Sequence, residues 1–139
     1  MFPTHPTRVF DANSAGAKAL GGLPDWDLSD LYSGVDAPEL AADLARLEKD
    51  CAAFAADYEG KLASLDAAGM LACIQRDEKI TSVAGRIMSF AGLRYHQKTT
   101  DATRAKFMSD CQDKITRFTT PLVFFTLEIN RIEDAQLDA

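Results

Sequence analysis

Histidine is scarce in this chain of 139 residues: only His5 and His96 occur, far apart and neither followed by glutamate. A zinc site of the HExxH type needs two histidines one helical turn apart, with the glutamate beside them as the base. The sequence also lacks the patterns GxxxxGKS or GxxxxGKT, GxGxxG and GxSxG, which mark phosphate-binding loops, dinucleotide sites and nucleophile elbows. We therefore expect no catalytic, cofactor-binding or metal-ligating residue in this chain itself.

An excess of basic residues is also missing. Lys and Arg number 15 against 21 Asp and Glu, which gives a formal net charge of −6 and a pI near 4.8. Because binding to phosphates or anionic lipids needs clustered cations, this balance argues against nucleic-acid and membrane partners. No apolar run approaches the roughly 20 residues of a membrane span, and no secretory signal is visible. The length and composition indicate one soluble globular domain.

Cysteine is present in an odd number, with no CxxC spacing. Cys51, Cys73 and Cys111 each fall on an apolar position of a helical pattern. This arrangement predicts reduced core thiols of a cytoplasmic protein, and it argues against disulfides or metal ligands.

The first 22 residues contain Pro and Gly without helical periodicity, which predicts a flexible leader. The next ten residues, LPDWDLSDLY, include the only tryptophan and alternate apolar residues with acids. They are too acidic for a strand and too short for a helix. We expect an extended or tightly turned segment pinned by a buried Trp26, with Leu28 and Leu31 around it.

A first helix is expected over about 37–59. Asp36 and Glu39 form a pair like a capping box, Pro38 is tolerated in the first turn, and Gly60 is a typical stop. Apolar residues recur in steps of three and four along one stripe: Leu40, Leu44, Leu47, Cys51, Phe54 and Tyr58. Asp43, Glu48, Lys49, Asp50 and Asp57 lie off this stripe, which predicts that they face solvent.

A second helix is expected over about 65–96, starting near Ser64 or Asp66. Its buried face should contain Met70, Ile74, Val83, Ile87 and Phe90. Asp77 interrupts this face, so a flexible point near Asp77 to Ile80 is an alternative to one continuous helix. Gly85 and Gly92, seven residues apart, indicate a close approach of two helices. The polar residues Arg94, Tyr95 and His96 end the helix, where cations face the negative end of its dipole.

A third helix is expected over about 102–130, capped by Asp101 or by Thr99 or Thr100. Its stripe comprises Met108, Cys111, Ile115, Phe118, Leu122, Phe125 and Ile129. Pro121 lies inside this stripe, which predicts a kink near Arg117 to Pro121 because proline removes a backbone hydrogen bond. Residues 132–139 read like the start of another helix, at which the sequence ends. The expected fold is all-α, with long antiparallel helices forming a helical hairpin or bundle.

Several segments together resemble the N-terminal region of oligoendopeptidase F, a family of zinc metallopeptidases related to thimet oligopeptidase. They are LPDWDLSDLYSGVDAPEL at 23–40, Asp43-Leu44, FAADYEGKL at 54–62, GRIMSFAGLRY at 85–95, TTD at 99–101 and FFTLEIN at 124–130. Their order and spacing match the family from about Leu23 to the end of the sequence. Pro121 and Gln97-Lys98 depart from the family pattern.

The resemblance implies a larger, mostly helical parent enzyme that cleaves short peptides in a deep channel. Its zinc is held by HExxH and a downstream glutamate, and its N-terminal helices wall and cap the channel. Residues 23–139 correspond to that capping domain, truncated before the catalytic domain. No catalytic or metal residue of the family can therefore be placed on this chain. The implied partners are the missing catalytic domain and, in the parent, short peptide substrates.

A second hypothesis is a free-standing helical interaction or dimerisation module without enzymatic activity. In either case, the apolar stretches 87–93 and 123–129 would lack a covering partner in the isolated chain. Such patches favour self-association. We therefore expect a homo-oligomer.

Overall fold

The computed structural model describes residues 25–132, and within this range every regular element is helical. The elements are α2 (Pro38–Tyr58), the 3₁₀ turn η1 (Leu62–Ser64), α3 (Ala67–His96), α4 (Ala102–Thr119), the 3₁₀ turn η2 (Thr120–Leu122) and α5 (Val123–Ile129). The prediction of an all-α fold is confirmed. The leader expected over 1–22 and most of the helix start expected over 132–139 lie outside the described residues.

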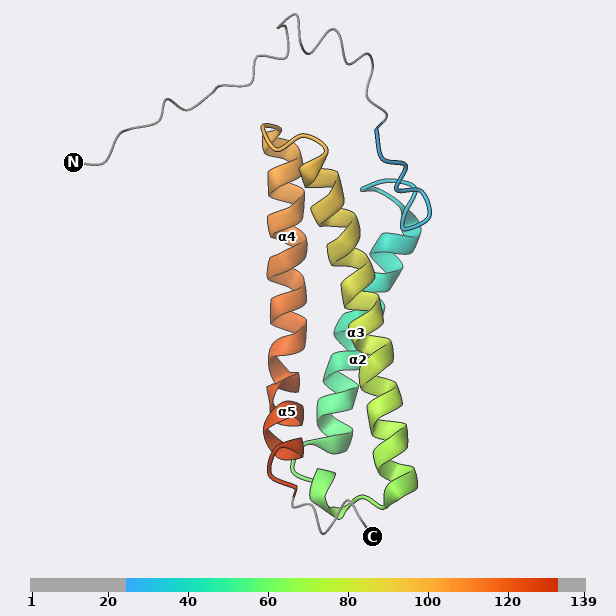
Figure 1. Ribbon diagram of the computed structural model, residues 1–139, viewed down its shortest axis with the longest axis vertical. Helices are drawn as coiled ribbons and strands as arrows, with labels where there is room; N and C mark the ends of the chain where they lie inside the picture. The colour runs from blue at the N-terminus through green and yellow to red at the C-terminus, as the bar shows by residue number, and fades with distance from the viewer. Residues whose placement is uncertain (1–24, 133–139) are drawn as a thin grey trace, which may run out of the picture.

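The three long helices α2, α3 and α4 lie side by side and alternate in direction, and each contacts the other two (Figure 1). The connection with η1 lies at one end of the bundle, and the α3–α4 connection lies at the other. The short α5 continues beyond α4 and packs against η1. No helix in this part of the chain is long and apolar enough to cross a membrane.

Helix α2 buries the expected stripe. Leu40, Leu47, Cys51 and Phe54 are buried, and the other stripe residues are partly buried. The predicted capping pair is wrong: Ala37, not Asp36, is the N-cap and makes no side-chain cap bond, while Pro38 opens the first turn. Pro38 has no N–H group and so removes one of the donors that a helix start leaves unpaired. Gly60 ends the helix at φ 75°, as predicted, in the conformation that glycine adopts without strain.

Helix α3 begins where Asp66 accepts a hydrogen bond from the Gly69 N–H at 2.7 Å, and it continues unbroken through Asp77. Its buried residues are Cys73, Ile80, Ala84, Ile87, Phe90 and Ala91. The predicted face is therefore partly wrong, because Ile74 is exposed while Met70 and Val83 are only half-buried. Cys73 is buried, as predicted for a core thiol. The face of α3 toward α2 and α4 also buries Ala84 and Ala91, whose small side chains give little signal in the sequence.

The proposed role of the helical glycines is also wrong. A Cβ atom placed on Gly85 or Gly92 would meet no heavy atom within 4 Å. Neither position is therefore a site of close approach between helices.

Helix α4 begins as expected, because the Asp101 carboxylate accepts from the N–H groups of Thr103 and Arg104. It ends at Thr119, and Pro121 lies in the first turn of η2. The break therefore falls at the predicted kink. Phe118 before it and Phe124 after it are both buried, so the chain keeps an apolar side toward the core across the break.

Trp26 is not the buried anchor that the sequence predicts, because 56% of its surface is exposed. Its backbone is held by a hydrogen bond from Gln97 Nε2 to the Trp26 carbonyl at 2.8 Å. The anchor of this segment is Tyr32, which is 3% exposed and packs edge-on against Phe90 with ring centroids 5.3 Å apart.

Candidate functional site

A buried carboxylate joins the N-terminal segment to the bundle. Asp43 on α2 accepts from the Tyr32 hydroxyl at 2.7 Å, from Arg46 at 2.9 Å and from Arg86 of α3 at 3.4 Å. Arg86 also donates to the Leu31 carbonyl, and its guanidinium lies 4.4 Å from the centre of the Tyr32 ring. Burial raises the pKa of Tyr32 well above its usual range, and the hydrogen bond to Asp43 adds to this effect.

The prediction that Asp43 faces solvent is wrong. Asp43 is 9% exposed, and both of its carboxylate oxygens accept hydrogen bonds. The hydroxyl and guanidinium groups that compensate for its burial come from residues 11 and 43 positions away. Because its hydrogen-bonding capacity is used internally, we interpret this cluster as structural.

The polar end of α3 is also closed by internal contacts. Arg104 donates to the Arg94 carbonyl at 3.1 Å and to Gln97 Oε1 at 3.0 Å. His96 is exposed, and the centre of its ring lies 5.2 Å from that of Tyr95. Arg94 and His96 both lie in the last turn, as predicted, where the positive charge of Arg94 suits the helix dipole. His5 lies outside the described residues.

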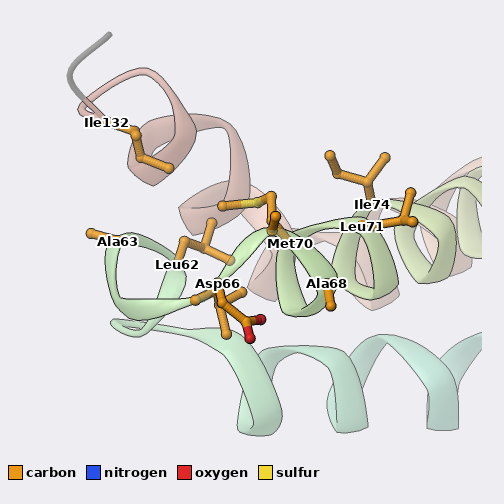
Figure 2. A pocket seen from close by; sticks show the side chains of 10 residues that line it. Leu62, Ala63, Asp66, Ala68, Met70, Leu71, Ile74 and Ile132 are labelled. Carbon is orange, nitrogen blue, oxygen red and sulfur yellow. The ribbon is translucent and has the colours of Figure 1, made fainter. Parts of the chain in front are cut away.

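An open apolar hollow lies at the η1 end of the bundle, and we call it the bundle-end pocket. Its volume is about 750 Å³. It is lined by Leu62, Ala63, Leu65, Asp66, Ala67, Ala68, Met70, Leu71, Ile74 and Ile132. Figure 2 shows Ile132 across from Met70, with Leu71 and Ile74 following along α3 and the Asp66 carboxylate pointing away from Ile132. Leu71 is 55% exposed and Ile74 is 38% exposed.

Glu128 of α5 holds the wall of this pocket in place. Its carboxylate accepts from the Gly60 N–H at 2.7 Å and from the Leu62 N–H at 3.4 Å. These bonds tie α5 to the connection between α2 and α3. On the outer side of α5, Val123 and Leu127 are 58% and 52% exposed, one helical turn apart.

A second hollow of about 430 Å³ lies between α3 and the break after α4, and we call it the Asp77 cleft. It is lined by Asp77, Ile80, Thr81, Ala84, Thr119, Leu122, Val123, Phe125 and Thr126. Burial raises the pKa of Asp77, and repulsion from the negative charge of Glu78 adds to this effect. Among residues 25–132, the Asp77 side chain has no hydrogen bond or ion pair. The sequence signalled this residue only as an interruption of an apolar stripe.

The three cysteines are buried and unpaired, as predicted for core thiols. Burial is the main reason why the pKa values of Cys51 and Cys73 rise to about 11, and the negative charge of Asp77 contributes to both. Burial also raises the pKa of Cys111. Thiols held in this neutral form are poor nucleophiles and poor metal ligands.

Comparisons with protein-family models, with curated proteins and with solved structures gave no match. The resemblance to oligoendopeptidase F therefore stays a prediction. In the part of the chain that the structure describes, no group of three or more His, Cys, Asp or Glu side chains is placed to hold a metal ion.

Proposed function

We propose that residues 23–139 form the helical, channel-capping N-terminal domain of a larger zinc oligopeptidase similar to oligoendopeptidase F. In this proposal the chain supplies a wall for the peptide channel, and the missing catalytic domain supplies the zinc and the hydrolytic chemistry. The all-α architecture supports it, because the family resemblance implies helices throughout this region. The proposal also places the parent enzyme in the cytoplasm, because unpaired thiols such as the three found here are typical of a reducing compartment.

The observation that carries the proposal is the exposed apolar surface at one end of the bundle. The bundle-end pocket presents Leu71 and Ile74, and α5 presents Val123 and Leu127. Soluble monomers rarely leave large contiguous apolar patches uncovered, and such patches mark protein contacts. Two of the segments that carry the resemblance lie in these elements: 54–62 ends at Leu62 in the pocket wall, and 124–130 forms most of α5. This surface is therefore suited to rest on the catalytic domain.

The first test concerns the polypeptide in its source cells. An antibody raised against this domain should detect a protein much larger than 15.2 kDa. The precipitated protein should contain zinc and should cleave a quenched-fluorescent peptide until a chelator is added. A single band near 15 kDa without such activity would contradict the proposal.

The second test uses the purified chain alone. We expect it neither to hydrolyse the same peptides nor to retain zinc through gel filtration. Chelator-sensitive hydrolysis by the isolated chain would show that it contains a catalytic site of its own.

A free-standing dimerisation module is the alternative, and it would use the same exposed leucines. The two proposals differ in what the domain binds in extracts. A precipitate that contains only a second copy of the short chain would favour the dimerisation module.

A further inference from the structure

The Asp77 cleft lies where regular helix packing stops. Helix α4 ends at Thr119, and the chain passes through η2 before α5 begins at Val123. Opposite this break, α3 is continuous and presents Asp77, Ile80, Thr81 and Ala84. The hollow of about 430 Å³ between them falls within the size range of pockets that hold small ligands or side chains.

The charge in this cleft is not neutralised by the neighbouring cation. Arg76, the preceding residue, forms an ion pair with Asp57 at 2.6 Å, and its guanidinium lies 5.9 Å from the centre of the Phe54 ring. The adjacent Glu78 adds repulsion and is exposed on the same helix. A partly desolvated carboxylate is costly without a cation, so a partner that brings one gains a charge-assisted hydrogen bond.

The rest of the lining suits an aliphatic chain. Leu122, Val123 and Phe125 provide apolar surface from the η2–α5 side, and Ile80 and Ala84 provide it from α3. The Thr119 hydroxyl already donates to the Ile115 carbonyl at 2.9 Å. A lysine or arginine side chain packs its methylene stem on such surface while its charged end reaches an acid.

We propose that the Asp77 cleft binds a peptide segment that carries a lysine or arginine side chain between apolar residues. The carboxylate selects the cation, and the apolar rim receives its stem and its neighbours. A divalent metal ion is a poorer occupant, because calcium sites in proteins combine several oxygen ligands and the cleft offers a single carboxylate among mostly apolar residues. This proposal is independent of the peptidase assignment, since it concerns binding by this chain alone.

The test measures fluorescence anisotropy of a labelled peptide with the full chain. The probe has a central lysine flanked by leucines, and its matched control has norleucine at the centre. Wild-type protein should bind the lysine peptide at least about tenfold more tightly than the norleucine peptide, because only the lysine pairs with the carboxylate. Added salt should reduce the difference.

Two substitutions remove the same charge from neighbouring positions. Asp77→Asn should weaken binding of the lysine peptide at least about tenfold, whereas Glu78→Gln, which does not line the cleft, should change it less than about twofold. Val123→Lys places a competing cation at the exposed rim and should also weaken binding. It provides an independent test if Asp77→Asn fails to give a native helical spectrum.

Several results would overturn the proposal. They are equal binding of the two peptides, equal effects of Asp77→Asn and Glu78→Gln, or no saturable binding up to millimolar protein. Self-association that Asp77→Asn abolishes, without peptide binding, would identify a second copy as the occupant instead. Loss of peptide binding would leave the zinc and peptidase tests of the larger protein unaffected.

Discussion

At the scale of single residues, the choice between two aromatic side chains decides how the N-terminal segment is attached. Tyr32 has a hydroxyl that compensates for the burial of the Asp43 carboxylate, and its ring fits against Phe90. The indole of Trp26 is exposed, while the Trp26 carbonyl accepts a hydrogen bond from Gln97. The more apolar residue therefore stays exposed, while the residue that satisfies a buried charge is enclosed.

Replacing Tyr32 by phenylalanine should lower the free energy of unfolding by about 1–2 kcal/mol, because Asp43 loses one hydrogen-bond donor but keeps its arginine partners. Trp26→Ala is the control and should change stability by less than about 0.5 kcal/mol, because the side chain is exposed. Urea titrations of the three proteins measure both effects. A larger loss in the Trp26 variant would contradict this assignment of the anchor.

Stability should fall as the pH rises above about 9. Cys51 and Cys73 have pKa values raised to about 11 in the folded protein, and the pKa of Tyr32 is raised as well. Unfolded thiols ionise near pH 8.5, so the unfolded state releases protons that the folded state retains. The stabilisation is fully present below that pH and is lost as the pH rises through 11.

Urea midpoints measured between pH 7 and 11 test this dependence. A double variant, Cys51→Ala with Cys73→Ala, should be less stable at pH 7 but should show a shallower decline above pH 9. An equally steep decline in the double variant would exclude the thiols as its cause.

At the scale of elements, two glycines, Gly60 and Gly85, have opposite roles. Gly60 has φ 75° at the end of α2, whereas Gly85 is an exposed position inside α3 with open space around its Cβ direction. At Gly60 the effect of a substitution depends on the positive φ, which a side chain would strain. At Gly85 it depends on the backbone entropy that glycine loses on folding.

Alanine should therefore have opposite effects at these two sites. Gly85→Ala should raise the free energy of unfolding by up to about 1 kcal/mol, and Gly60→Ala should lower it by about 1–2 kcal/mol. Thermal unfolding followed by circular dichroism gives the two signs. Destabilisation by Gly85→Ala would contradict this expectation and would favour the close helix approach that the sequence predicted.

The link between α5 and the α2–α3 connection depends on Glu128. Glu128→Ala should lower stability by about 1 kcal/mol, because two backbone N–H groups lose a charged acceptor that is partly exposed to water. Asp110→Ala, which removes an exposed ion pair with Lys106, is the control and should cost less than about 0.5 kcal/mol. Equal effects would mean that the Glu128 contacts contribute no more than surface charges.

At the scale of the whole molecule, four of the six large apolar side chains that are exposed among residues 25–132 lie toward the η1 end of the bundle: Leu71, Ile74, Val123 and Leu127. We expect the isolated chain to form a dimer or larger species at micromolar concentration through Leu71 and Leu127. Sedimentation velocity measures this state. Leu71→Glu combined with Leu127→Glu should give a 15.2 kDa species, whereas the exposed α4 substitution Gln112→Glu should not. A monomeric wild-type chain across this range would contradict the expectation.

Local chemistry made several features predictable from the sequence alone. Asp66 and Asp101 cap helices because their short carboxylates reach the free N–H groups of a first turn. Gly60 stops α2 because it tolerates positive φ, and Pro121 interrupts the third helix because it lacks a donor. The three-and-four spacing of α2 determined its buried face, since that face packs against the rest of one bundle.

Only the tertiary structure decided which polar groups are enclosed. Asp43 is buried because Tyr32 and Arg86, distant in sequence, converge on it, and Trp26 is exposed because no helix of residues 25–132 covers it. Because α3 contacts two helices, the small Ala84 and Ala91 are buried while the larger Ile74 is exposed. The break at Pro121 left space opposite Asp77 and so formed a cleft. Such outcomes depend on contacts between distant residues, and periodicity along one helix carries no information about those contacts.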